Sequence, residues 1–124
     1  MAAVIKVLVV DDSGYMRAVI RKYLEPQGYV IAGEAQDGVE AVELYNKVRP
    51  DIVTMDISMK KMGGIEATKQ IKAVDSMAKI VMVSALGEAR FIKEAIQAGA
   101  ADFIIKPFEE KRLIASITSV MNKG

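Results

Sequence analysis

Short apolar runs alternate with longer amphipathic stretches along the whole chain, and this alternation constrains the fold more than any other feature of the sequence. The first run, over 4–10, is almost continuously apolar, which is typical of a strand buried on both faces of a sheet. The run over 29–34 is more mixed, so we expect that strand to lie nearer an edge. The predicted strands are 4–10, 29–34, 51–56, 79–84 and 102–106.

A predicted helix follows each of these strands. Ser13 and Asp37 stand where the N-caps of the first two helices are expected, and Gly99 stands where the fourth should end. Five repeats of strand then helix predict an α/β fold, with a parallel sheet covered by helices on both faces and right-handed crossovers. We expect a single domain over 1–124. The predicted helices are 13–25, a segment from 37 to just before Pro50, 65–74, 88–98 and 109–121.

Absent residue types remove whole classes of chemistry. The chain has no cysteine and no histidine, which excludes disulfides, cysteine–zinc sites and Ser-His-Asp triads. With 17 basic and 16 acidic residues, the charge balance gives no support for binding to nucleic acid or membranes. No apolar run approaches the roughly 18–20 residues that cross a bilayer, and no secretory signal is evident, so we expect a cytoplasmic location.

Polar side chains gather at the ends of the predicted strands, where ligands bind in open α/β sheets. Only the second strand, with Glu34 near its end, offers nothing obvious. The other four contribute Asp11 and Asp12 after the first strand, Asp56 at the end of the third, Ser84 at the end of the fourth and Lys106 at the end of the fifth.

Three carboxylates at one edge repel one another unless a cation joins them, and Mg²⁺ prefers such oxygen ligands. Lys106 carries a charge that can hold a phosphate oxygen, and Ser84 supplies a hydroxyl donor. These parts can stabilise a phosphoryl group in transit, with one carboxylate as the nucleophile that forms an aspartyl phosphate. Each residue alone is explained more simply as a cap, a turn residue or a surface charge, so the combination is what indicates function.

The same segments resemble the receiver domain of two-component response regulators over essentially the whole chain. The matching segments are 7–13, 51–59, 83–85 and 106–108, and segments 33–35 and 95–100 further resemble the stand-alone receiver proteins of chemotaxis. The resemblance implies a flavodoxin-like fold with a five-stranded parallel sheet in the order 2-1-3-4-5. We also expect no separate effector domain, because no linker or second domain is evident along the sequence.

The resemblance gives the acidic residues separate roles. Asp56 is the expected phosphoacceptor. Asp12, Asp56 and the backbone carbonyl of Ser58 are expected to bind Mg²⁺ directly, whereas Asp11 is expected to act mainly through a water molecule.

The resemblance also implies a switch. Ser84 is expected to donate a hydrogen bond to the phosphoryl group, and Lys106, followed by a cis bond to Pro107, is expected to form an ion pair with it. Ser84 would then move toward the phosphate and Phe103 would rotate inward, which changes the surface of the last two helices and the strand between them. A plain core role for Phe103 also fits the sequence.

Without an effector domain, the output is expected to be a protein contact. The resemblance implies a CheA-like histidine kinase as the donor, a FliM-like flagellar motor switch protein as the target and a phosphatase as a further candidate partner. We expect a monomer that binds neither nucleic acid nor membranes. We also expect that it is not a turnover enzyme and catalyses only its own phosphorylation and dephosphorylation.

The loop after Asp56 departs from the family pattern. Lys60 stands where proline is usual, Lys61 follows it, and Gly63 stands where Asn or Asp is common. Losing a proline and gaining a glycine predicts a looser loop. Our hypothesis is that the two lysines alter the phosphorylation rate or select a partner, and a solvated loop without a role is the simpler interpretation.

Three rival functions share parts of this pattern. A flavodoxin-type module would bind FMN on the same topology, but Asp11 and Asp12 would repel its phosphate. A phosphatase would use a carboxylate nucleophile with Mg²⁺, although the usual acid–base residues are not evident. A phosphorelay intermediate would pass the phosphoryl group to a histidine phosphotransfer protein from the same site, and the sequence separates it poorly from a chemotaxis regulator.

Overall fold

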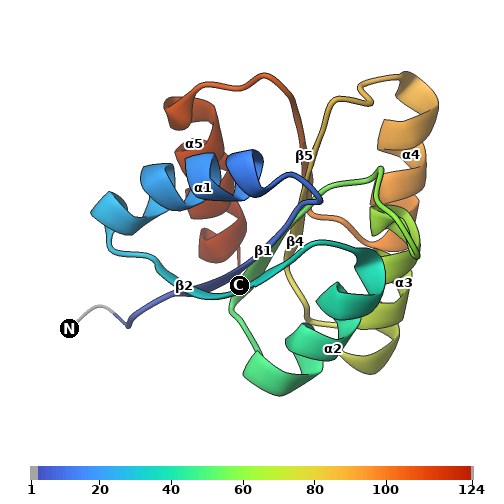
Figure 1. Ribbon diagram of the computed structural model, residues 1–124, viewed down its shortest axis with the longest axis horizontal. Helices are drawn as coiled ribbons and strands as arrows, with labels where there is room; N and C mark the ends of the chain where they lie inside the picture. The colour runs from blue at the N-terminus through green and yellow to red at the C-terminus, as the bar shows by residue number, and fades with distance from the viewer. Residues whose placement is uncertain (1–2, 124) are drawn as a thin grey trace.

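A five-stranded parallel sheet lies between two layers of helices in the computed structural model, which describes residues 3–123 (Figure 1). The strand order is β2-β1-β3-β4-β5, which confirms the predicted topology and the edge position of the second strand. The strands are β1 (Lys6–Val10), β2 (Val30–Ala35), β3 (Ile52–Met55), β4 (Ile80–Ser84) and β5 (Asp102–Ile105).

Helices cover both faces of the sheet, as the alternation predicts. In Figure 1, α1 and α5 lie together on one face, and α2, α3 and α4 cover the other. A short 3₁₀ turn, η1 (Glu25–Gln27), follows the first helix. The helices are α1 (Gly14–Leu24), α2 (Gly38–Val48), α3 (Gly64–Val74), α4 (Ala89–Ala98) and α5 (Glu110–Asn122).

Alternate residues of each strand enter different cores, because successive side chains point to opposite faces of a sheet. In β1, Leu8 and Val10 belong to the core under α2, α3 and α4. Val7 and Val9 belong to the core under α1 and α5. All four side chains are buried, which explains why this strand reads as a continuous apolar run.

Three predicted helix ends are confirmed. The Ser13 hydroxyl accepts a hydrogen bond from the backbone N–H of Met16 at 3.1 Å, so it caps α1. The Asp37 carboxylate caps α2 in the same way, at 2.8 Å from the N–H of Glu40. Gly99 ends α4 with φ 111°, in the left-handed region where a side chain would be strained.

Strand β1 starts later than predicted. Its partner in the sheet begins at Val30, which pairs with Lys6, so Val4 and Ile5 precede the paired region. Val4 is 62% exposed, unlike the residues of the strand proper. The other boundaries differ from prediction by one or two residues, as is usual for element ends.

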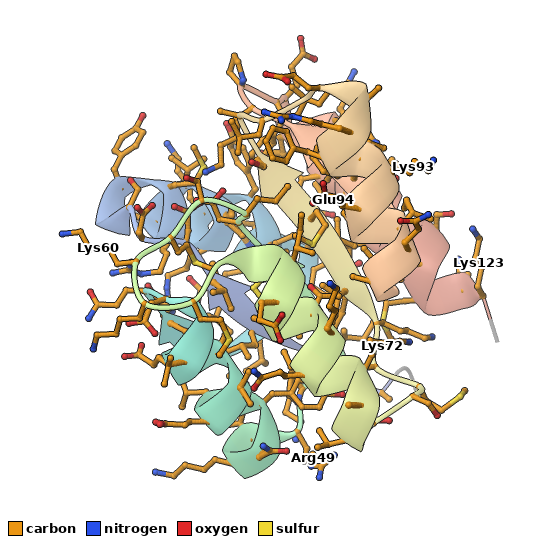
Figure 2. The ribbon with its side chains drawn as sticks, turned by 90° about the vertical axis from the view of Figure 1, so that its right-hand side faces the viewer. Arg49, Lys60, Lys72, Lys93, Glu94 and Lys123 are labelled. Atoms are coloured by element: carbon orange, nitrogen blue, oxygen red, sulfur yellow. The ribbon has the colours of Figure 1, made fainter. Side chains whose placement is uncertain are left out.

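Charged side chains such as Lys60, Lys93 and Lys123 project outward from the ribbon (Figure 2). Within residues 3–123, no helix combines the length and apolar character needed to span a bilayer.

Candidate functional site

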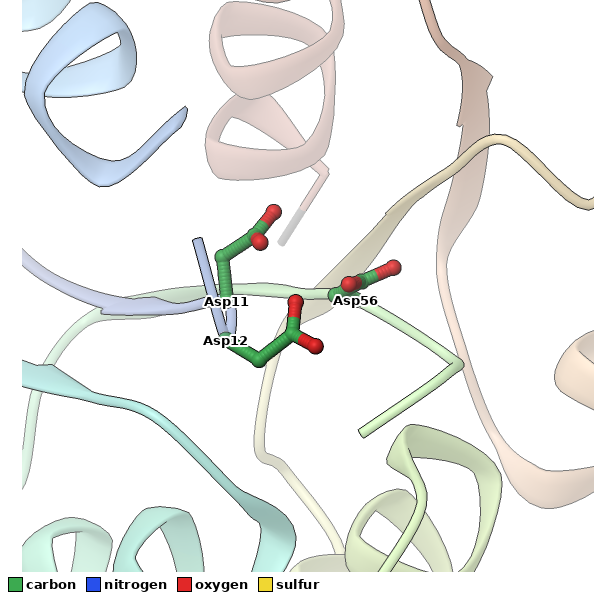
Figure 3. Close-up of side chains that lie close together, drawn as sticks. All are labelled: Asp11, Asp12 and Asp56. Carbon is green, nitrogen blue, oxygen red and sulfur yellow. The ribbon is translucent and has the colours of Figure 1, made fainter. Parts of the chain in front are cut away.

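Three carboxylates converge at the carboxyl edge of the sheet (Figure 3). Asp11, Asp12 and Asp56 each offer an oxygen, and these oxygens all lie within 4.8 Å of one another. They meet because β1 and β3 are parallel neighbours in which Val10 pairs with Met55, so the residues that follow both strands reach the same place.

The backbone of this cluster continues the hydrogen bonding of the sheet. The N–H of Asp11 donates to the carbonyl of Ala35 at 3.0 Å, and the N–H of Asp56 donates to the carbonyl of Val10, also at 3.0 Å. The two acidic residues therefore sit on a rigid edge and not on free loops, which keeps their positions defined.

Lys106, which directly follows the edge strand β5, forms ion pairs with two of the carboxylates. Its Nζ lies 2.6 Å from Asp11 Oδ2 and 3.7 Å from Asp56 Oδ2. The backbone N–H of Lys106 donates to the carbonyl of Ser84 at 2.9 Å, which fixes the start of its loop, and the peptide bond to Pro107 is cis as expected. A single positive charge thus faces the pair of buried acids.

Burial dominates the electrostatics of Asp56. Loss of solvent and the negative charge of Asp11 raise the pKa of the Asp56 carboxyl to about 6 from an ordinary 3.8, and the charge of Lys106 opposes this rise. The charge of Lys106 therefore offsets only part of the cost of ionising Asp56. A hard cation with oxygen preference, such as Mg²⁺, fits the donor set of three neighbouring carboxylates.

The structure places the two expected switch residues on neighbouring strands. Ser84 ends β4, is buried, and its hydroxyl accepts a hydrogen bond from the N–H of Leu86 at 3.1 Å. Phe103 lies in β5 opposite Met82 and is 9% exposed, within the core under α2, α3 and α4. Ser58 is exposed in the loop that follows β3.

Two further residues contact the site without having been assigned from the sequence. The guanidinium of Arg17 donates to the backbone carbonyl of Asp11 at 2.6 Å. Gly64 begins α3 so close to β3 that a Cβ there would overlap the carbonyl oxygen of Asp56. Only the glycine carries a signal in the sequence, because it follows another glycine just before a helix.

The loop between β3 and α3, which carries Lys60 and Lys61, lies beside Asp12 of the acidic cluster. A hollow of about 320 Å³ beside Asp12 is lined by Gln36 and Asp37 from the start of α2 and by Lys60 and Lys61. Met62 anchors this loop, since its carbonyl accepts a hydrogen bond from the N–H of Gly38 at 2.9 Å. Both lysines are exposed.

Comparison with known proteins finds similar sequences over most of the chain. Residues 7–118 match the family described as the response regulator receiver domain. A Bacillus subtilis protein named Protein CcdB is 50% identical over 116 residues, which are 94% of this chain and 97% of that protein. The chemotaxis protein CheY of Thermotoga maritima is 48% identical over 115 residues, which are 93% of this chain and 96% of that protein.

Solved structures show the same similarity. A crystal structure of a CheX–CheY complex with BeF3 and Mg²⁺ from Borrelia burgdorferi matches with a TM-score of 0.93 and 36% identity, over 96% of this chain and 90% of that one. The response regulator domain of Thermotoga maritima CheB matches with a TM-score of 0.90 and 39% identity, over 98% of this chain and 99% of that one.

Proposed function

The chain belongs to the family of response regulator receiver domains, and we propose from this that it accepts a phosphoryl group on Asp56 and thereby switches a protein-binding surface in chemotaxis. The observation that carries the proposal is the cluster at the sheet edge, where Asp11, Asp12 and Asp56 meet and Lys106 bridges two of them. This cluster would bring together a nucleophile, the metal ligands and a cation that binds phosphate.

The reaction uses Asp56 as a nucleophile toward phosphohistidine of a kinase. A carboxylate oxygen of Asp56 forms a bond to phosphorus while the phosphorus–nitrogen bond of the donor breaks, and the imidazole leaves. Burial of Asp56 supports this role, because a desolvated carboxylate is less stabilised before reaction. Lys106, now 3.7 Å from Asp56, would pair with an oxygen of the transferred group.

Asp12, Asp56 and the backbone carbonyl of Ser58 would hold Mg²⁺, with Asp11 acting through water. The bound ion would supply positive charge that offsets the charge on the phosphoryl oxygens. Three carboxylate oxygens within 4.8 Å support this assignment, as does the presence of Mg²⁺ with the Borrelia burgdorferi relative.

Ser84 and Phe103 would carry the signal away from Asp56. The Ser84 hydroxyl, which accepts a hydrogen bond from the Leu86 N–H, would donate its own proton to an oxygen of the phosphoryl group. The changed surface would include the hollow of about 570 Å³ that Phe103, Ile105 and Lys111 help to line between β5 and α5. A FliM-like motor switch protein is the proposed target of this surface.

A CheA-like histidine kinase is the proposed donor, and a phosphatase is a further proposed partner. The CheX–CheY complex shows that one relative is bound by a second protein. Catalysis by this chain would be confined to its own phosphorylation and dephosphorylation.

A second candidate function would use the same acidic cluster. A phosphorelay intermediate, which passes the phosphoryl group from Asp56 to a histidine phosphotransfer protein, uses the same site.

Transfer of radiolabelled phosphate from a purified CheA-like kinase tests the proposal. Label should move to the wild-type chain in the presence of Mg²⁺ and not to the Asp56→Asn variant. When a histidine phosphotransfer protein is then added, it should not become labelled. The label should stay on this chain or be released as inorganic phosphate by hydrolysis. Rapid onward movement of the label would support the phosphorelay, and no transfer from any kinase would overturn both functions.

A further inference from the structure

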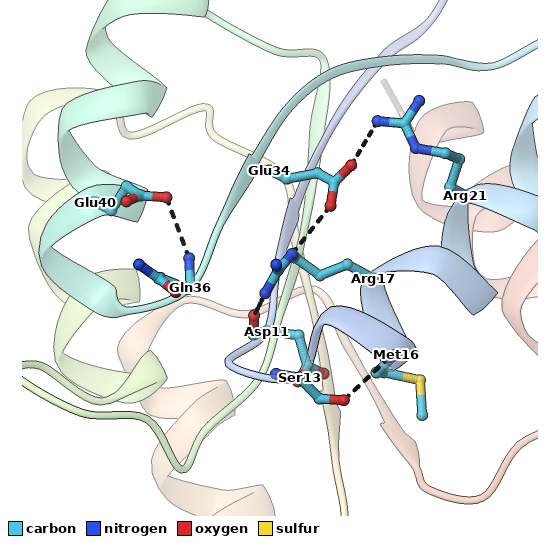
Figure 4. Close-up of polar contacts among 8 residues, drawn as sticks. All are labelled: Asp11, Ser13, Met16, Arg17, Arg21, Glu34, Gln36 and Glu40. Carbon is cyan, nitrogen blue, oxygen red and sulfur yellow. Dashed lines mark hydrogen bonds and ion pairs between the residues drawn. The ribbon is translucent and has the colours of Figure 1, made fainter.

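Arg17 of α1 makes two contacts in different directions (Figure 4). Its Nε donates to Glu34 Oε1 at 3.0 Å, and its Nη1 donates to the backbone carbonyl of Asp11 at 2.6 Å. Glu34 stands on β2, where it pairs with Val9 of β1. The side chain thereby ties the loop after β1 to both α1 and β2.

The carbonyl of Asp11 belongs to the peptide bond that joins Asp11 to Asp12. Because a peptide unit is planar, holding this oxygen also fixes the direction in which the chain enters Asp12. The other bonds of the segment involve Asp11 itself or the start of α1: the Asp11 carboxylate accepts from the Ser13 N–H at 2.9 Å and from Lys106 at 2.6 Å. Arg17 therefore holds the link between the two acidic residues.

Glu34 is itself held in place by a second arginine. Arg21, one turn further along α1, donates from Nη2 to Glu34 Oε2 at 2.6 Å, and its Nη1 lies 3.1 Å from Glu25. These hydrogen bonds lower the pKa of the Glu34 carboxyl, with the bond from Arg21 contributing most, so Glu34 is ionised at neutral pH. A fixed, charged carboxylate orients the guanidinium of Arg17.

We propose that Arg17 and Glu34 are positioning residues for the metal site, holding the Asp11–Asp12 peptide so that both carboxylates are in place before Mg²⁺ binds. This inference rests on the proposed function, because it concerns the metal of that same site. It assigns a role to β2, whose end carries no ligand of its own. A site held in its binding geometry loses less conformational freedom when the metal arrives.

Charge and geometry make opposite predictions for Arg17. If Arg17 acted only as a nearby positive charge, removing it would strengthen Mg²⁺ binding, since like charges repel. If it acts by holding the Asp11 carbonyl, removing it weakens Mg²⁺ binding. Lysine keeps the charge but cannot bond in two fixed directions, so Arg17→Lys isolates the geometric part.

Lys22 offers a matched control for charge. Lys22→Gln removes one positive charge from the exposed side of the same helix and leaves the bonds of Arg17 and Arg21 to Glu34 intact. The four proteins to compare are the wild type, Arg17→Gln, Arg17→Lys and Lys22→Gln. The dissociation constant of Mg²⁺ is measured by titration of backbone amide NMR shifts around Asp12, and urea unfolding without Mg²⁺ reports stability separately.

We expect Arg17→Gln to weaken Mg²⁺ binding about tenfold, Arg17→Lys to weaken it severalfold and Lys22→Gln to change it less than about twofold. A Glu34→Ala change should weaken binding in the wild type but have little further effect in the Arg17→Gln background, since both act through one contact. Equal or tighter binding by Arg17→Gln would overturn the inference while the proposed function stands. No saturable Mg²⁺ shift in the wild type would overturn the metal site itself.

Discussion

At the level of single residues, two effects raise the pKa of the Asp56 carboxyl from 3.8 to about 6: the burial of Asp56 and the negative charge of Asp11. A carboxyl whose pKa is higher in the folded than in the unfolded state makes the folded state bind protons more tightly. Ionised Asp56 therefore costs stability above pH 6, and this cost falls as the pH drops from about 6 towards 4.

Asp56→Asn should accordingly raise the free energy of unfolding of the metal-free protein by about 1–3 kcal/mol at pH 8. The gain should shrink on acidification through pH 6, as followed by urea unfolding at several pH values. Asp75→Asn is a control of opposite sign, because a hydrogen bond from Tyr45 lowers the pKa of Asp75 and the charge there is stabilising. A gain at Asp56 that does not depend on pH would contradict the electrostatic explanation.

Thr54 lies in β3 with its side chain fully buried, and its hydroxyl has no hydrogen-bond partner among the described residues. Thr54→Val, which keeps the shape and removes the hydroxyl, should raise the free energy of unfolding by about 1 kcal/mol. Thr68→Val serves as the control, since the equally buried Thr68 hydroxyl lies 3.6 Å from the sulfur of Met82. Destabilisation by Thr54→Val would mean that this hydroxyl is bonded.

At the level of elements, the loop between β3 and α3 is confined at both ends. The N–H of Gly64 donates to the carbonyl of Ile57 at 2.8 Å, and a Cβ at Gly64 would overlap the carbonyl oxygen of Asp56. The start of α3 thus packs directly on the backbone of the proposed phosphoacceptor, and only glycine permits this approach.

Gly64→Ala should destabilise the protein by about 2–3 kcal/mol, because the backbone must shift to accept the methyl group. It should also slow phosphorylation, since the shift moves Asp56. Gly14→Ala is the control for stability, as a Cβ there would meet only Arg17 Nη2 at 3.5 Å. Thermal unfolding of the two variants measures the difference in stability between them. Equal stability would contradict the close packing of Gly64 on Asp56.

Lys60 and Lys61 add two exposed positive charges beside Asp12. Replacing both with glutamine should slow phosphorylation by an anionic small donor such as acetyl phosphate severalfold at low salt, because the charges attract the donor. The difference should fade at high ionic strength. The same double replacement at Lys47 and Lys69, on α2 and α3, should have no such effect, and equal rates for all three proteins would leave the loop lysines without a kinetic role.

The elements and most of the site were predictable because both follow from patterns along the chain. Apolar runs located the strands, and parallel neighbours necessarily bring Asp11 and Asp56 to one edge. The contact between Arg17 and the Asp11 carbonyl was not predictable, since it depends on the side-chain conformation of one arginine between a helix and a strand. The late start of β1 depends on where β2 begins, which no local pattern in the first strand records.

At the level of the whole molecule, the fold brings residues nearly a hundred positions apart into one site. Lys106 and Asp11 are separated by 95 residues and lie 2.6 Å apart. The sheet supplies the fixed positions, and α4, β5 and α5 form the surface that we propose the site changes. We propose that this arrangement makes Asp56 a Mg²⁺-dependent phosphoacceptor.

Intact-mass spectrometry after treatment with acetyl phosphate tests whether Asp56 is the phosphoacceptor. The wild-type chain should gain the mass of one phosphoryl group, about 80 Da, only when Mg²⁺ is present, and the Asp56→Asn variant should gain nothing. A wild-type chain that remains unmodified with Mg²⁺, or an Asp56→Asn variant that is modified equally well, would show that Asp56 is not a Mg²⁺-dependent phosphoacceptor.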